Sequence, residues 1–162
     1  MNVVLIQGTI GSSAQVGRTQ GITEGLAKNP KYHLLAKQSG EFTQAKGQEV
    51  MESFLKAYPK IDVVFCENDN EAFGAIDAIK AAGKRPGKDI IIISFDAVHE
   101  AFNKMIAGEL NCAVECNPLH GPRIAEIIQK LEKGEKAEKI QYVVEGVFDQ
   151  ANAAKELPNR KY

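Results

Sequence analysis

Three strand-like runs of this sequence end in an amide or a carboxylate, and these side chains are the best placed to do chemistry. The runs and the residues that follow them are 63–67 with Asn68, 90–95 with Asp96, and 112–114 with Glu115. Apolar, β-branched runs are typical of strands buried on both faces of a parallel sheet. The carboxyl ends of such strands line the crevice where ligands bind. Amides and carboxylates on one rim, without a cationic excess, suit a ligand rich in hydroxyl groups.

Two further residues complete a candidate binding site. Arg18 lies early in the helix expected after the first strand, and Phe42 stands just before the second helix. Charged side chains form forked hydrogen bonds with adjacent hydroxyls, and an aromatic face packs on the C–H surface of a sugar. Together with Asn68, Asp96 and Glu115 they predict a carbohydrate site. A structural interpretation stays open for each: Asn68 and Asp96 as helix caps, Phe42 in the core, Arg18 paired with Asp96.

Enzymatic chemistry is only weakly indicated. Residues 8–11 form a glycine-containing turn after the first strand, but neither GxGxxG nor GxxxxGKS/T is present. Asp69, Asp96 and Glu115 could pair as acid and base, although nothing in the sequence fixes their separation. No serine or cysteine stands in a nucleophile motif. We therefore expect a binding protein and not an enzyme.

The spacing of the histidines and cysteines indicates neither a metal site nor a disulfide. The histidines, which share no ligand spacing, are His33, His99 and His120. The cysteines, which form no CxxC, are Cys66, Cys112 and Cys116. In an extended segment Cys112 and Cys116 should lie roughly 13 Å apart, too far for a disulfide. The sequence thus predicts free thiols, no metal site and no cofactor.

Composition restricts the class of partner. The 162 residues carry a formal net charge of −1, with 44% hydrophobic and 25% charged residues. This size suits one self-sufficient core, and the near-neutral charge argues against nucleic acid, which needs a basic face. No apolar run approaches the roughly 20 residues of a membrane span, so no membrane insertion is expected. Residues 3–7 resemble a strand more than a signal peptide.

Strand and helix patterns alternate as far as Pro118, which predicts a three-layer, doubly wound α/β fold with a parallel sheet in flavodoxin-like order. The expected strands are residues 3–7, 32–37, 63–67, 90–95 and 112–115, with a helix in each interval. The first helix carries glycines at positions 17, 21 and 25, which we expect to permit close approach to the sheet.

The chain beyond Pro118 follows a different pattern. A helix is expected over about 120–133, with an apolar side made of Ile124, Ile127, Ile128 and Leu131. A solvated linker rich in lysine and glutamate continues to Lys139. Residues 141–148 could form a last strand, and the tail to Tyr162 is polar.

Several segments together resemble the type I periplasmic sugar-binding proteins of ABC transporters, the ribose, galactose and galactofuranose group. The matching segments are QGT at 7–9, RTQG at 18–21, QSGEFT at 38–43, KGQEVMESF at 46–54, NDNEAFGAI at 68–76, SFDA at 94–97 and AVECNP at 113–118. The likeness covers nearly the whole chain, and the SGEFT and VECNP pieces are most similar to the galactofuranose-type branch.

The resemblance implies sugar contacts at matching positions. These are Arg18, Phe42, Asn68, Asp96 and Glu115. Ribose-type members carry a glutamine one place after Glu115, at the position of Cys116 here. Where the family often has Phe-Asp-Gly, this chain has Ala97 in place of the glycine, although a positive φ suits glycine better.

Members of this family have two lobes that close on the ligand about a hinge, and this chain resembles only the second. The resemblance implies that residues 1–118 form the sugar-binding lobe of the C-terminal type. Residues 119–139 would be a helix of the first lobe, and 140–162 a hinge-crossing strand with a polar tail. Without that lobe, the apolar helix should fold back locally, pack in a homodimer, or bind a separately supplied first lobe.

The function implied is that of a solute-binding component of an ABC importer. It would capture a small sugar such as galactofuranose, galactose or ribose and deliver it to the transporter permease. The implied location is the periplasm or, for a lipid-anchored protein, the cell exterior. The alternative is the effector-binding domain of a lac-repressor-type transcription regulator, which shares the fold and would need a helix-turn-helix upstream.

Overall fold

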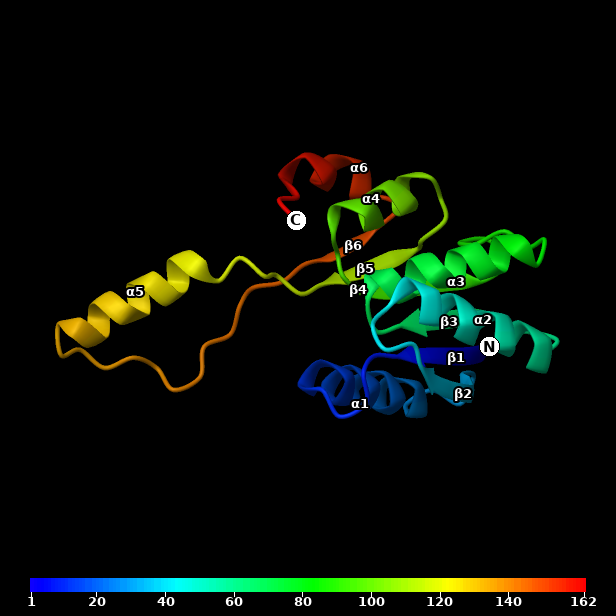
Figure 1. Ribbon diagram of the computed structural model, residues 1–162, viewed down its shortest axis with the longest axis horizontal. Helices are drawn as coiled ribbons and strands as arrows, with labels where there is room; N and C mark the ends of the chain where they lie inside the picture. The colour runs from blue at the N-terminus through cyan, green and yellow to red at the C-terminus, as the bar shows by residue number, and fades with distance from the viewer.

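A computed structural model describes residues 1–162 and shows an α/β fold around one six-stranded sheet (Figure 1). The elements are β1 (Asn2–Gln7), α1 (Ser13–Ala27), β2 (His33–Ser39), α2 (Gln44–Ala57), β3 (Val63–Cys66), α3 (Asp69–Ala81), β4 (Ile91–Asp96), α4 (His99–Ile106), β5 (Cys112–Glu115), α5 (Gly121–Glu132), β6 (Val147–Asp149), α6 (Ala153–Glu156) and a 3₁₀-helix (Leu157–Asn159). The strand order is β2-β1-β3-β4-β5-β6. The parallel, flavodoxin-like order of the first five strands is confirmed, and β6 adds an antiparallel edge beside β5.

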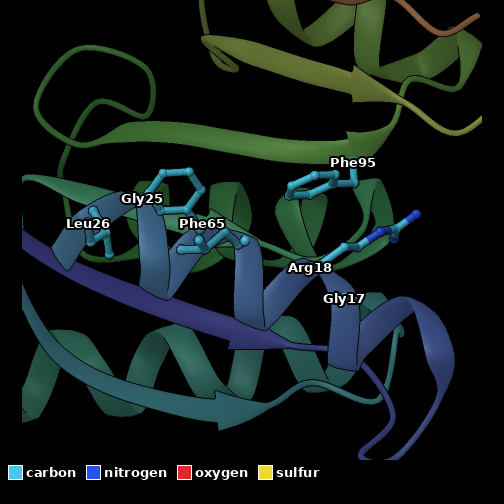
Figure 2. A pocket seen from close by; sticks show the side chains of 8 residues that line it. Gly17, Arg18, Gly25, Leu26, Phe65 and Phe95 are labelled. Carbon is cyan, nitrogen blue, oxygen red and sulfur yellow. The ribbon is translucent and has the colours of Figure 1, made fainter. Parts of the chain in front are cut away.

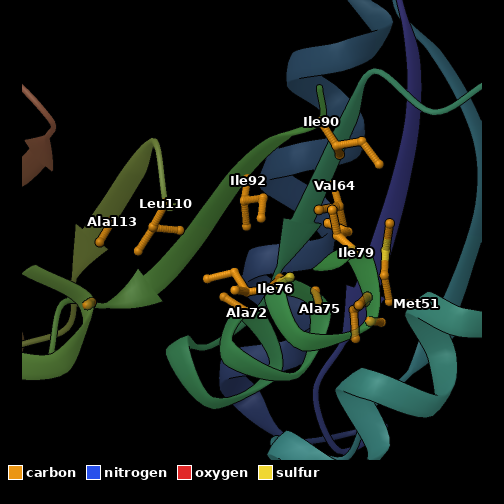
Figure 3. Close-up of a cluster of buried hydrophobic side chains, with 14 of the residues drawn as sticks. Met51, Val64, Ala72, Ala75, Ile76, Ile79, Ile90, Ile92, Leu110 and Ala113 are labelled. Carbon is orange, nitrogen blue, oxygen red and sulfur yellow. The ribbon is translucent and has the colours of Figure 1, made fainter. Parts of the chain in front are cut away.

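One face of the sheet is covered by α2, α3 and α4. Strand residues at every second position, such as Val64 and Ile92, pack against helix residues such as Ile76 in one continuous apolar cluster (Figure 3). The helices α2 and α3 approach each other so closely that a Cβ built on Gly74 would lie only 2.1 Å from the backbone oxygen of Gln44. We call this side the closed face, and it holds most of the hydrophobic core.

The opposite face is covered by α1 alone. Val3 and Leu5 of β1 are fully buried, whereas Phe65 of β3 and Ile93 of β4 are only half-buried. We call this side the open face. The expectation that the strands are buried on both faces therefore holds for β1 but is wrong for β3 and β4.

The glycines of α1 border this open face. A Cβ built on Gly17, Gly21 or Gly25 would meet no heavy atom within 4 Å. The predicted close approach of these glycines to the sheet is therefore wrong. They form a smooth strip beside unoccupied space, because residues four apart share one side of a helix.

The helix α5 stands apart from the rest of the molecule (Figure 1). It belongs to residues 116–146, here called the arm, which run out from β5 and return to β6. The helix predicted over 120–133 is confirmed, but none of its residues is buried and it does not fold back on the sheet. The strand predicted over 141–148 is limited to Val147–Asp149. No helix combines the length and the apolarity that crossing a bilayer requires.

The C-terminal tail packs on the body of the molecule, although the sequence indicated only a polar end. Ala153 is fully buried, and Leu157 packs against the core cluster. The guanidinium of Arg160 lies 5.2 Å from the ring centre of Phe102 and 4.7 Å from that of Phe148. The tail thus secures β6 and α4 to each other at the far edge of the closed face.

Candidate ligand-binding site

The carboxyl edge of the sheet gathers the segments that carry all five predicted site residues. Asp96 and Glu115 end β4 and β5 and are partners in register. Asn68 follows β3 as the N-cap of α3. Arg18 comes from α1, and Phe42 comes from the loop before α2. The topology therefore brings residues far apart in sequence to one edge, as the rule for parallel sheets predicts.

Arg18 reaches from α1 to the ends of β3 and β4. Its guanidinium donates to the backbone oxygen of Glu67 and, over 2.8 Å, to Oδ1 of Asp96. The Arg18 side chain is 13% exposed and the Asp96 side chain 31%. The guanidinium also lies 5.1 Å from the ring centre of Phe95, beside which Figure 2 shows it. This pair is only partly covered, so its free N–H and carboxylate groups remain available to the hydroxyls of a ligand.

Phe42 is held in a tight loop between β2 and α2. Both Glu41 and Phe42 have positive φ, +56° and +60°, a region that residues other than glycine rarely adopt. The Phe42 N–H donates to Oε1 of Glu71 over 3.0 Å, and its carbonyl accepts from Nδ2 of Asn68 over 3.0 Å. Its ring lies against Gly8, where a Cβ would be 1.9 Å from the ring. Glycine at position 8 therefore allows the aromatic ring to lie at this edge.

Asn68 links the Phe42 loop to α3. Its Oδ1 accepts from the N–H of Glu71 over 2.8 Å, and the residue is 7% exposed. The structural role foreseen for Asn68, as a helix cap, is confirmed. The amide retains one further Nδ2 hydrogen, and a contact from it to a ligand stays a prediction.

Buried carboxylates support this edge from beneath, a role that the sequence reasoning did not assign to them. Glu67 accepts from the N–H of Gly8 over 2.7 Å, and Asp69 accepts from the N–H of Val98 over 2.8 Å. Burial raises the pKa of Asp69 and of Glu71 to about 7 in each case, although hydrogen bonds oppose the rise. The signal available in the sequence was the dense run of acids and amides at 67–71, directly after a strand.

The turn after β4 has a strained backbone. Asp96 has φ +101° and Ala97 has φ +59°. The positive φ anticipated for Ala97 is confirmed, and the residue is fully buried. Asp69 holds the turn by accepting from the N–H of Val98, the next residue. Strain of this kind persists only where the surroundings fix it, and it clusters at ligand sites.

Glu115 has partners different from those of the other four residues. Its carboxylate, 7% exposed, accepts from Arg160 over 2.9 Å, from the hydroxyl of Tyr162 over 2.7 Å and from the N–H of Gly146 over 2.8 Å. Burial favours a higher pKa for Glu115, but these hydrogen bonds outweigh it and lower the pKa. The structure thus joins Glu115 to the tail. The neighbouring Cys116, at the position where ribose-type members carry a glutamine, is exposed. A sugar contact from Glu115 stays a prediction.

A guanidinium–carboxylate pair, an amide and an aromatic ring lie at one open edge of the sheet. The charged pair can form forked hydrogen bonds with adjacent hydroxyls, and the ring can cover an apolar sugar face. No group of three or more His, Cys, Asp or Glu side chains is arranged to hold a metal ion. Fold and site together define a lobe of the periplasmic-binding-protein type.

Comparison with known proteins identifies the family. Residues 1–136 match the model of the periplasmic binding protein domain, and the chain belongs to that family. It is 38% identical over 164 aligned positions to the galactofuranose-binding protein YtfQ of Escherichia coli, covering 99% of this chain and 52% of that protein. It is 33% identical to the ribose import binding protein RbsB of Salmonella typhimurium, covering 84% of this chain and 45% of that protein.

Solved structures agree with the sequence matches. A Mycobacterium smegmatis protein in complex with β-D-fucofuranose is 44% identical, with a TM-score of 0.94 over 100% of this chain and 53% of that one. The periplasmic binding protein of a Shewanella arabinose ABC transporter, bound to L-arabinofuranose, is 40% identical, with a TM-score of 0.93 over 99% of this chain and 54% of that one. The chain spans about half the length of these relatives. Its resemblance to sugar-binding proteins of ABC transporters is thereby confirmed.

Proposed function

We propose that this chain is the second lobe of a two-lobed solute-binding protein that captures a small sugar for an ABC importer. The observation that carries the proposal is the partly exposed Arg18–Asp96 pair at the carboxyl edge, 2.8 Å apart. At the same edge, Asn68 donates a hydrogen bond to the loop that carries Phe42. A guanidinium and a carboxylate supply donors and acceptors together, which is the combination that vicinal hydroxyls need.

The strain at this edge supports the same proposal. The non-glycine residues with positive φ are two predicted sugar contacts, Phe42 and Asp96, and one neighbour of each, Glu41 and Ala97. Buried carboxylates hold both strained turns by accepting backbone N–H groups. A site fixed in advance in this way loses little conformational freedom when a ligand binds. No step of chemistry is required, so we propose a binding protein and not an enzyme.

The relatives support one class of sugar. Three of these similar proteins are named for a furanose or hold one: galactofuranose, β-D-fucofuranose and L-arabinofuranose. We propose that the ligand of the complete site is a five-membered-ring sugar, bound between this lobe and a first lobe. The importer permease is the partner of the two-lobed protein, and the site of action lies outside the cytoplasmic membrane.

The test is sugar binding by a two-lobed protein in which this chain follows the first lobe of YtfQ. Isothermal titration with galactofuranose, L-arabinose and ribose should show binding to this protein. The 162-residue chain alone should bind feebly, because it offers only part of the contacts. Sub-micromolar affinity of the chain alone, or no binding by the two-lobed protein, would contradict the proposal.

Matched variants locate the site. Asp96→Asn and Arg18→Met should each weaken binding by at least about tenfold, on the order of 1.4 kcal/mol. The control is Arg85→Met, because Arg85 forms an equivalent pair with Asp89, 2.6 Å apart, on an exposed loop remote from the edge. If Arg85→Met weakens binding as much as Arg18→Met does, the assignment of the site is wrong.

A further inference from the structure

A buried carboxyl group lies beneath the Phe42 loop, which connects β2 and α2. It belongs to Glu71, which stands in the first turn of α3 and is fully buried. Its Oε1 accepts from the Phe42 N–H over 3.0 Å, whereas its Oε2 has no hydrogen-bond partner within the protein. A Cβ built on Gly40 would lie 2.9 Å from Oε1, so the glycine leaves room for the carboxyl group. Glu71 therefore contacts the loop on both sides of Glu41.

The Phe42 loop depends on groups outside it. Glu41 and Phe42 both have positive φ, a conformation that persists only where the surroundings fix it. Two side chains of α3 do so, because Glu71 accepts from the Phe42 N–H and Asn68 donates to the Phe42 carbonyl. The Asn68 amide does not titrate. Glu71 is thus the support whose strength changes with protonation.

The charge of Glu71 decides how strongly it holds the loop. A carboxylate accepts a hydrogen bond more strongly than a neutral carboxyl group does. A proton on Oε2 would gain no acceptor within the protein, so protonation offers no new contact in exchange. The ionised form of Glu71 therefore favours the observed conformation of the Phe42 loop more than the protonated form does.

Glu71 changes its protonation state near neutral pH. Burial raises the pKa of Glu71 from 4.5 to about 7, and the hydrogen bond from Phe42 opposes the rise. The neighbouring carboxylate of Glu67 raises the pKa further. Both forms of Glu71 are consequently populated around neutral pH, where a small change in pH shifts the balance between them.

The other ionisable groups in the surroundings do not keep Glu71 ionised. They come from β3 and its end, from α3, from the loop itself, from α2, and from the cations that act on Glu67: Cys66, Glu67, Asp69, Glu41, Lys46, Arg18 and Lys37. None of the cations forms an ion pair with Glu71, and Arg18 and Lys46 have carboxylate partners of their own. Acidification can therefore neutralise Glu71.

We propose that Glu71 is a positioning residue that links sugar affinity to pH. When ionised it holds the Phe42 loop so that the ring can cover a sugar, and when protonated it loosens that hold. This inference rests on the proposed function, since Phe42 is a predicted sugar contact. Sugar binding favours the ordered loop and hence the ionised carboxylate, so by linkage it releases a proton to the solvent and strengthens as the pH rises.

Proton NMR of the 162-residue chain tests the link to the loop without any sugar. The amide proton of Phe42 should shift downfield with a midpoint at about pH 7, as Glu71 ionises. In Glu71→Gln the same amide should not shift, because glutamine stays neutral. The amide of Val98, which is bonded to Asp69, is the internal control and should still titrate in this variant.

Isothermal titration of the two-lobed protein tests the link to affinity. The probe is whichever of galactofuranose, L-arabinose and ribose binds most tightly. Between about pH 5.5 and 8.5 the dissociation constant of the wild type should fall about fivefold, as expected for a hydrogen bond that becomes charge-assisted. In Glu71→Gln it should stay at the low-pH value of the wild type throughout. A merely structural role would weaken binding at every pH and leave the profile unchanged.

Two further variants assign the profile to Glu71. Asp69 also has a pKa raised to about 7 by burial, and it holds the other strained turn, so Asp69→Asn should keep the fivefold change with pH. Glu109→Gln is the matched control, because Glu109 pairs with Lys80 at the opposite edge of the sheet. It should bind as the wild type does at every pH. Circular dichroism checks the fold of each variant, and the wild-type measurements need no variant.

The outcomes separate this inference from the proposed function. A Phe42 amide that does not titrate, or that still titrates in Glu71→Gln, would overturn the link to the loop. A wild-type affinity that is constant or falls as the pH rises would overturn the link to affinity, as would a profile lost in Asp69→Asn but kept in Glu71→Gln. If the wild type binds none of these sugars at any pH, the proposed function fails and the link to affinity with it, whereas the Phe42 amide still decides whether Glu71 holds the loop.

Discussion

The two faces of the central sheet are built from the same strands, yet they are covered to very different extents. On the closed face α2, α3 and α4 bury alternate residues of the central strands, such as Val4, Val64 and Ile92. On the open face α1 leaves Phe65 and Ile93 half-buried beside a groove. Glycines occur in helices on both sides but serve opposite purposes. Gly74 permits contact between two helices, whereas Gly21 borders empty space. A glycine in a helix therefore does not by itself reveal whether another element packs against it.

Neighbouring residues of β4 provide the strongest test of this difference. Ile92 is fully buried on the closed face, and Ile93 is half-buried on the open face. Ile92→Ala should lower the free energy of unfolding by about 2–5 kcal/mol, because it leaves a cavity. Ile93→Ala should lower it by about 1 kcal/mol, since that side chain removes less apolar area from water. Urea denaturation measures both values, and equal losses would show that the open face is covered in solution.

A pair of glycines tests the same contrast with opposite signs. In Gly74→Ala the new methyl group would lie 2.1 Å from the backbone oxygen of Gln44 and must push α2 and α3 apart. Overpacking of this kind should lower the free energy of unfolding by about 1–3 kcal/mol. Gly21→Ala meets no atom and should raise it by about 0.5–1 kcal/mol through helix propensity. Thermal denaturation of both variants would contradict this interpretation if the two shifts had the same sign.

The stability of the protein should depend on pH through two buried carboxyl groups of α3, a helix of the closed face. The pKa of buried Asp69 is raised from 3.8 to about 7 in the folded state. Between pH 4 and 7 the unfolded chain releases this proton while the folded chain keeps it, so stability falls as the pH rises through that window. Glu71, raised to about 7, acts in the same direction. Below pH 4 both states hold the proton and the dependence disappears.

Asp69→Asn isolates this effect. Asparagine resembles the protonated acid, so the variant should lose part of the slope of unfolding free energy against pH between 4 and 7, at a cost of about 1 kcal/mol at pH 5. The matched control is Asp89→Asn. Asp89 is exposed, and hydrogen bonds from Arg85 lower its pKa to about 2, so its titration lies outside the window. An unchanged slope in Asp69→Asn would show that Asp69 is ionised in the folded state.

Much of the fold could be predicted from the sequence, because the periods of strand and helix are local properties. The isoleucine run of β4 and the polar residue that ends each strand were sufficient to predict a parallel sheet and its ligand edge. The covering of each face could not be predicted in the same way. Whether Gly21 touches a neighbour depends on which helices lie over the sheet, and the local sequence does not encode this.

The site was predictable to a similar degree. The Arg18–Asp96 pair and the cap formed by Asn68 were anticipated as structural interpretations, and both occur. The cluster around Glu115 was not anticipated. Its partners Arg160 and Tyr162 lie 45 and 47 residues further along the chain, in a tail whose composition indicates only a polar end. The contacts of Glu115 with Arg160 and Tyr162 form only because the arm brings the chain back to the sheet at β6, and the local sequence does not specify this path.

The tail provides the smallest test, since it closes the far edge of the closed face. Tyr162→Phe removes one of the hydrogen bonds that Glu115 accepts, while Arg160 and the N–H of Gly146 remain. The loss should therefore be about 0.5–1.5 kcal/mol, with faster hydrogen exchange limited to β6 and the tail. The matched control is Tyr142→Phe, because Tyr142 lies in the arm and is 87% exposed. If Tyr142→Phe cost as much, the stability assigned to the Tyr162 hydroxyl would not be specific to the tail.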